Sequence, residues 1–140
     1  MDLAMIEDLE RQGLIQRLPP DPKKVADAMA LARRDIDTAR TLLSTDCDWA
    51  YTIAYNAALQ AGRALMFAKG YRPDGANQHI SVVKFAGLFL SEGDALVFDR
   101  MRRKRHGSVY DTVGTISAAE AEFAVSAAVA LVQKVTTLLG

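Results

Sequence analysis

The chain has 140 residues, half of them apolar, and its 17 basic side chains balance its 17 acidic side chains. A single globular domain is expected at this length. The one cysteine, Cys47, excludes an internal disulfide. The formal net charge of zero excludes a global attraction to nucleic acid, so any contact with RNA or DNA would need a local basic patch.

The pattern of charge and apolarity argues against export and against a membrane span. Acidic residues stand at positions 2, 7, 8 and 10, where a secretory signal needs a basic start followed by an apolar run. The most apolar stretch, 123–132, is about half as long as the roughly 20 residues that cross a bilayer, and it contains Ser126. We therefore expect a cytoplasmic protein without a membrane segment.

The N-terminal part differs from the rest of the chain. Residues 1–20 are expected to form a short helix, with Ile6 and Leu9 on its apolar side, followed by a proline-rich turn. The remaining residues, 21–140, are expected to form one helical bundle domain. Its first helix begins with Asp21 as N-cap and Pro22 as first helical residue, and apolar side chains recur at spacings of three and four as far as residue 43.

Four further helical segments follow. A helix predicted from Asp48 to Gly70 carries a stripe of alanines and is apolar on most sides, which is typical of a central helix. After a turn-rich loop, helices are predicted over 78–90 and from 95 to His106 or Tyr110. The last runs over 117–139 from a capping box. No strand signal is found, so the expected fold is all-α, an antiparallel up-and-down bundle of four long helices plus a short N-terminal helix.

A basic segment is the one dense charge cluster in the sequence. Five of the six residues from Arg100 to Arg105 are basic, and His106 follows them. On a continuous helix, one stripe would hold the side chains at positions 99, 102, 103, 106 and 110, which are Asp99, Arg102, Arg103, His106 and Tyr110.

This stripe would combine phosphate binding with proton transfer. Arginine binds phosphate with paired hydrogen bonds, and histidine exchanges a proton near neutral pH. Together they suit metal-independent cleavage of RNA, in which a base activates the 2′-hydroxyl, an acid protonates the leaving oxygen and cations stabilise the charge. A simpler interpretation is also open, because a basic run at a helix end is commonly a solvated face favoured by the helix dipole.

Other candidate sites carry weaker signals. His79 follows the longest loop and could meet His106 in the fold, although a lone histidine at a helix start is more often a cap or a surface residue. Cys47 and the two histidines lack metal-ligand spacing, and the glycines follow no strand and form no phosphate-cradling pattern. We therefore expect no metal, no other cofactor, and neither a Rossmann nor a P-loop site.

Two segments resemble the HEPN family, small helical domains named for nucleotide binding in higher eukaryotes and prokaryotes. Residues 51–73 are similar to the family's second helix and the glycine turn after it, and residues 102–111 to its basic segment with a Tyr-Asp ending. The resemblance covers about residues 21–138. It implies a bundle of four or five helices, a homodimer with facing basic motifs, and often a minimal nucleotidyltransferase partner. Many members are metal-independent ribonucleases, including toxins of toxin-antitoxin pairs.

The family's catalytic signature, an arginine followed after four to six residues by a histidine, aligns in two ways. In the first, Arg100 and His106 are catalytic, with Met101 at a position that is usually polar. In the second, Arg105 is the signature arginine and Tyr110 replaces the catalytic histidine. Tyrosine, with an ordinary pKa of about 10, is a poor proton acceptor at neutral pH, so this register implies a degenerate site.

Roles are also expected for the remaining candidates. Arg102, Arg103 and Arg105 are expected to bind phosphate or RNA. Tyr110, Asp111 and His79 are expected to line the site. Tyr110 is also a candidate for modification by the nucleotidyltransferase. Two functions stay open: a metal-independent endoribonuclease toxin acting at a dimer cleft, and a non-catalytic module that binds RNA or a nucleotide beside a nucleotidyltransferase. A purely structural bundle is the third alternative.

Overall fold

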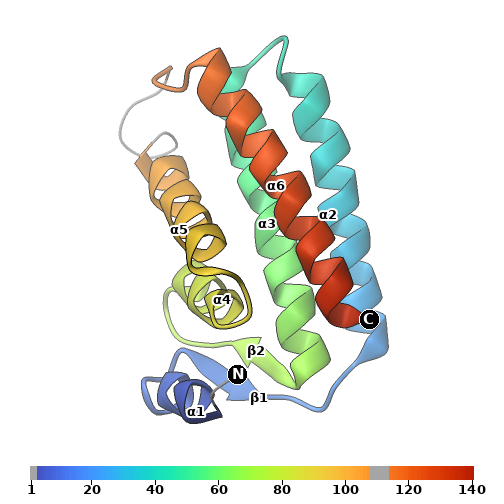
Figure 1. The fold of residues 1–140 in the computed structure, drawn as a ribbon, viewed down its shortest axis with the longest axis vertical. Coiled ribbons are helices and arrows are strands. Elements are labelled where there is room, and N and C mark those ends of the chain that lie inside the picture. The colour runs from blue at the N-terminus through green and yellow to red at the C-terminus, as the bar shows by residue number, and fades with distance from the viewer. Residues whose placement is uncertain (1–2, 108–113) are drawn as a thin grey trace.

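The computed structural model describes residues 3–107 and 114–140, which form a mostly helical fold with one small sheet (Figure 1). The elements found in these ranges, in chain order, are α1 (Leu3–Arg11), β1 (Ile15–Arg17), α2 (Pro22–Leu42), α3 (Cys47–Lys69), β2 (Tyr71–Pro73), α4 (Gln78–Gly87), α5 (Glu92–His106) and α6 (Ala118–Leu139). Tyr110 and Asp111 lie outside the described residues.

Helix α3 is the centre of the bundle, as its alanine stripe predicts. It packs against α2 and α6 on one side and against α4 and α5 on the other (Figure 1). Thirteen of its 23 residues are buried, most of them small, so neighbouring helices approach closely and bury their own apolar stripes. Burial of apolar surface around α3 is therefore the main source of stability of the fold.

Polar side chains fix the starts of the helices where the sequence indicates. Asp21 accepts hydrogen bonds from the backbone N–H groups of the first turn of α2, with Pro22 as the first helical residue. Ser117 and Glu120 form the predicted capping box at the start of α6. Helix α3 begins at Cys47, one residue before the predicted start at Asp48, because Asp46 is its N-cap. Such caps satisfy N–H groups that have no partner within the helix.

The Asp48 side chain is not the N-cap of α3 and instead binds the backbone of the segment before α6. Its carboxylate accepts a hydrogen bond from the N–H of Gly114 at 2.6 Å and another from the N–H of Ile116 at 3.3 Å. These bonds tie the segment before α6 to the start of α3. They also bring Ile116, which is buried, into the core.

The all-α prediction is confirmed for the bulk of the fold, with two corrections. The two three-residue strands form an antiparallel pair, Ile15 opposite Pro73 and Arg17 opposite Tyr71, although the sequence shows no strand signal. Pairing across more than 50 residues is a tertiary contact that local propensity does not encode. The segment predicted as a helix over 78–90 is the ten-residue α4, so among the described elements two short helices accompany the long ones.

The short α4 ends at Gly87, and α5 then begins at Glu92, three residues earlier than predicted, because the Ser91 side chain accepts a hydrogen bond from the N–H of Asp94. Helix α6 is the one described helix that is long and apolar enough to cross a membrane by length and composition alone. Its inner face, including Ala121, is buried and the helix packs on α3, as a core helix does.

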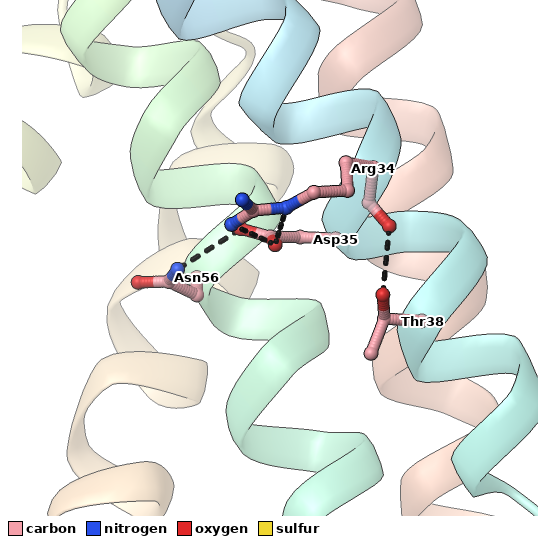
Figure 2. Close-up of polar contacts among 4 residues, drawn as sticks. All are labelled: Arg34, Asp35, Thr38 and Asn56. Atoms are coloured by element: carbon pink, nitrogen blue, oxygen red, sulfur yellow. Dashed lines mark hydrogen bonds and ion pairs between the residues drawn. The ribbon is translucent and has the colours of Figure 1, made fainter.

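A buried carboxylate joins α2 to α3. Asp35 is only 4% exposed, and Figure 2 shows its side chain between Arg34 and Asn56. The Arg34 guanidinium donates to Oδ1 at 3.0 and 3.2 Å, and Asn56 Nδ2 donates to Oδ2 at 3.0 Å. Both oxygens are therefore hydrogen-bonded, as a buried charge requires.

Candidate nucleic-acid interface

The basic segment is the C-terminal part of α5, and two buried side chains hold this helix against the bundle. Phe98 and Met101 are nearly inaccessible to solvent. Phe98 lies beside Tyr55 of α3, with ring centroids 6.1 Å apart. Because these side chains face inward, the charged residues between and beyond them project to either side of the helix.

One side carries two arginines that share a carboxylate. Asp99 Oδ1 accepts a hydrogen bond from Arg102 Nε at 3.1 Å and lies 3.0 Å from Arg102 Nη2, while Asp99 Oδ2 lies 3.2 Å from Arg103 Nε. The predicted stripe is confirmed over these three residues. The arrangement leaves two cations on one anion, and the more exposed pair, between Arg103 and Asp99, contributes only about 0–1 kcal/mol to stability. A phosphate could replace Asp99 as their partner.

The opposite side of α5 faces α6. Lys104 Nζ lies 3.1 Å from Glu120 Oε2, and Arg100, one turn earlier, lines a pocket of about 280 Å³ together with Tyr51 and Phe123. Burial, and next the charge of Glu120, raise the pKa of Tyr51 to about 12, whereas Arg100 opposes this shift.

His106 is the last residue of α5, and its side chain is exposed. Six residues of regular helix turn the chain through about 600°, so Arg100 and His106 point about 120° apart around the helix axis. The structure therefore does not bring these two predicted catalytic residues together on one face. His106 shares its face with Arg102 and Arg103 instead, as the spacing of four and three residues predicts.

His79 lies in a second polar cluster next to the basic segment. Its Nδ1 is 3.0 Å from the hydroxyl of Tyr55, and the two rings are 5.7 Å apart between centroids. Burial lowers the pKa of His79, and the positive charges of Arg105, Arg63 and Arg102 lower it further. The imidazole is therefore neutral at neutral pH. The sequence suggests a contact between His79 and His106, whereas in the structure the hydrogen-bond partner of His79 is Tyr55.

Arg63 belongs to the same cluster, and it is not among the site residues predicted from the sequence. Burial raises the pKa of Tyr55 to about 12, with Arg102, Arg105 and Arg63 acting in the opposite direction. Arg63 is half-buried on the central helix, and burial lowers its pKa. A charged residue in the middle of an otherwise apolar helix is the signal that could have identified this cluster, because such a charge is rarely buried without a function or a partner.

Within residues 3–107 and 114–140, no group of three or more histidine, cysteine, aspartate or glutamate side chains could hold a metal ion.

The fold is that of a helical bundle domain, and the C-terminal end of α5 is basic. Residues 25–138 match the HEPN domain, so the chain belongs to the HEPN family of nucleotide- and RNA-related modules, as the resemblance predicts. The chain is also similar in fold to TT1696 from Thermus thermophilus, with a TM-score of 0.63 and 20% sequence identity over 81% of this chain and 97% of that one. No curated protein matches the sequence.

Proposed function

We propose that this HEPN protein binds phosphate groups of RNA at the C-terminal end of α5. The observation that carries the proposal is the face formed by Arg102, Arg103 and His106, in which Asp99 is the carboxylate that pairs with both arginines. A phosphate accepts paired hydrogen bonds from a guanidinium, and its negative charge would balance the positive charge that Asp99 alone leaves on the two arginines. The zero net charge of the chain makes this local patch the determinant of binding.

Fluorescence anisotropy with a labelled single-stranded RNA tests this proposal. The double variant Arg102→Ala/Arg103→Ala should bind RNA at least about tenfold more weakly, since a hydrogen bond to a charged group contributes roughly 1.5–3 kcal/mol. The matched control is Arg33→Ala/Arg40→Ala, which removes the same charge from exposed positions of α2. An equal loss in both variants, or no loss in the first, would contradict the proposal.

Metal-independent RNA cleavage is a second candidate, favoured by the exposed imidazole of His106 one turn after the arginines. The 2′-oxygen would bond to the neighbouring phosphorus while the bond to the 5′-oxygen breaks, giving a 2′,3′-cyclic phosphate and a 5′-hydroxyl. One His106 would take the proton of the 2′-hydroxyl, and a second would give a proton to the 5′-oxygen. Arginines would stabilise the charge on the phosphate oxygens.

Two copies of His106 require a homodimer with the basic segments facing each other, as the family resemblance implies. A dimer would also supply Arg100 from the second protomer, since within one protomer Arg100 points away from His106 by about 120°. The HEPN dimer would thus assemble the signature pair between chains. Multi-angle light scattering of the purified protein would give the dimer mass; a monomer at micromolar concentration would remove this arrangement.

Cleavage of a mixed RNA pool in EDTA, by the wild type beside His106→Ala, separates the two functions. Wild-type cleavage that is lost in the variant supports the ribonuclease, and growth inhibition that a nucleotidyltransferase neutralises would make it a toxin. RNA bound but not cut by either protein supports the non-catalytic module working with a nucleotidyltransferase. Tyr110 is the candidate for modification by the nucleotidyltransferase that would neutralise the toxin, detectable as a mass increase of one nucleotide after incubation with the partner and a nucleoside triphosphate.

A further inference from the structure

A tyrosine and a histidine meet where α3, α4 and α5 converge. Tyr55 is 1% exposed, and its hydroxyl lies 3.0 Å from Nδ1 of the half-buried His79. Burial keeps the hydroxyl protonated, because it raises the pKa of Tyr55 to about 12. Within residues 3–107 and 114–140, His79 is the one hydrogen-bond partner of that hydroxyl. Tyr55 therefore donates to Nδ1, and the neutral ring carries its own proton on Nε2.

Positively charged side chains from two helices, α3 and α5, lie near Tyr55 and His79. Arg63 of α3 and two arginines of α5, Arg102 and Arg105, act electrostatically on both Tyr55 and His79. Asp99 is the acidic group of the described residues that acts on Tyr55, and it is already shared between Arg102 and its neighbour Arg103. The positive charges of the described groups therefore outnumber the negative charge near the imidazole.

Arg63 is the least satisfied of these cations. It is half-buried, and in the described part of the chain it makes no ion pair with a carboxylate. Burying part of a guanidinium without an anion is unfavourable, which the lowered pKa of Arg63 reflects. His79 adds a further donor and is the second residue of α4, at the positive end of that helix dipole. The missing partner of this cluster is an anion.

We infer that Tyr55, His79 and Arg63, with Arg102 beside them, form a phosphate-binding subsite between α3, α4 and α5. Arg63 would donate guanidinium hydrogen bonds to the phosphate, and His79 would donate Nε2–H while Tyr55 holds its ring in this tautomer. The inference deepens the proposed function, because it rests on RNA as the ligand and names the groups that receive a phosphate next to the α5 face. A tetrahedral phosphate suits donors that arrive from three helices.

The subsite predicts a coupling between anion binding and the protonation of His79. A bound phosphate offsets the repulsion from the three arginines, so it favours the charged imidazole and raises the pKa of His79. Nuclear magnetic resonance can follow this directly, since the chain has only two histidines and the variant His106→Ala leaves the signal of His79 alone. The probe is millimolar inorganic pyrophosphate, compared with sodium chloride of equal ionic strength.

We expect the pKa of His79 to lie below its ordinary value in chloride and to rise in pyrophosphate. An unchanged His79 titration in pyrophosphate would overturn the inference. The variant His79→Asn keeps an acceptor for Tyr55 near the position of Nδ1 but loses the outer donor, whereas His79→Gln keeps a donor near the position of Nε2. Pyrophosphate should bind roughly tenfold more weakly to the Asn variant and about as well to the Gln variant as to the wild type.

The arginine is tested by Arg63→Met, which keeps the apolar stem and removes the charge, with Arg33→Met as the matched control on exposed α2. Circular dichroism would verify that both variants fold. Pyrophosphate binding should fall about tenfold for Arg63→Met and by less than about twofold for Arg33→Met. Equal affinities for pyrophosphate in the two variants would overturn the assignment of Arg63.

These measurements distinguish the subsite from the proposed function. If RNA binding depends on Arg102 and Arg103 while His79 does not respond to pyrophosphate, the subsite is wrong and the proposed function stands. If pyrophosphate shifts the titration of His79 while RNA does not bind, the subsite is supported and RNA is not its ligand.

Discussion

Substitution of Gly62 by alanine tests how the subsite is positioned. Gly62 lies on α3, two turns after Tyr55, where Val82 of α4 packs against it. A Cβ atom at Gly62 would lie 2.5 Å from Cγ1 of Val82, with Phe98 and Ala86 at 3.6 and 3.8 Å. Ordinary contacts of this kind are about 3.5–4.0 Å, so α4 or the Val82 side chain would have to move.

Two opposing effects determine how much Gly62→Ala changes the free energy of unfolding. Overpacking of a buried site costs about 1–3 kcal/mol, and Val82 is completely buried, so it has no free space to turn into. Replacing glycine by alanine inside a helix contributes about 1 kcal/mol of stability. The net expectation is a loss of about 1 kcal/mol, which lowers the Tm by roughly 4 °C in a domain of this size.

Thermal unfolding of Gly62→Ala and of a control, Gly93→Ala, measures this balance. An added Cβ at Gly93 meets no atom within 4 Å, so the control should be unchanged or slightly stabilised. The His79 titration supplies a second readout, since displacement of α4 would weaken the contact with Tyr55 and move the pKa of His79 towards its ordinary value. If Gly62→Ala is as stable as Gly93→Ala, the close approach of α3 and α4 does not constrain the site.

Asp35→Ala should lower the free energy of unfolding in urea by about 1–3 kcal/mol, because it leaves the half-buried Asn56 amide without its acceptor; an equal change in the exposed control Asp37→Ala would contradict this. Burial and neighbouring arginines lower the pKa of His79, so the folded state favours the neutral ring. The stabilisation that results is present above about pH 6.5, the ordinary pKa of histidine, and is lost as the pH falls through the lower pKa of His79 in the folded protein. The wild type should therefore lose more stability than His79→Gln between pH 7.5 and pH 5, and equal losses would refute the assignment. Asp99→Asn should tighten RNA binding about two- to fivefold, since it removes two ion pairs, each worth about 0–1 kcal/mol, and releases both arginines; weaker binding in anisotropy would show that Asp99 positions them.

Local signals in the sequence were sufficient for most of the helices. Asp21 followed by Pro22, and Ser117 with Glu120, satisfy orphan backbone groups at helix starts, so they mark boundaries wherever the helix later packs. The alanine-rich stripe of α3 predicted its central place because only small side chains allow close approach on several sides. The β1–β2 pair has no such signal, since its stability comes from a partner strand distant in sequence.

The candidate site was predicted only in part. The spacing from Asp99 to the arginines at 102 and 103 was sufficient for their shared ion pairs, because neighbours on one helix face are fixed by helix geometry. The same geometry separates Arg100 from His106, which the family signature alone did not reveal. The meeting of Tyr55 with His79 depends on how α4 docks on α3 at Gly62, a tertiary contact that spacing along the chain does not contain.

The salt dependence of RNA binding tests most directly whether the end of α5 binds phosphate. Each phosphate contact on single-stranded nucleic acid contributes about −0.7 to the slope of log K against log salt concentration. The triple variant Arg102→Ala/Arg103→Ala/Arg105→Ala should therefore show a slope smaller in magnitude by about 2 than the wild type, while Arg33→Ala/Arg40→Ala keeps the wild-type slope. Identical slopes for the wild type and the triple variant would show that RNA does not bind there.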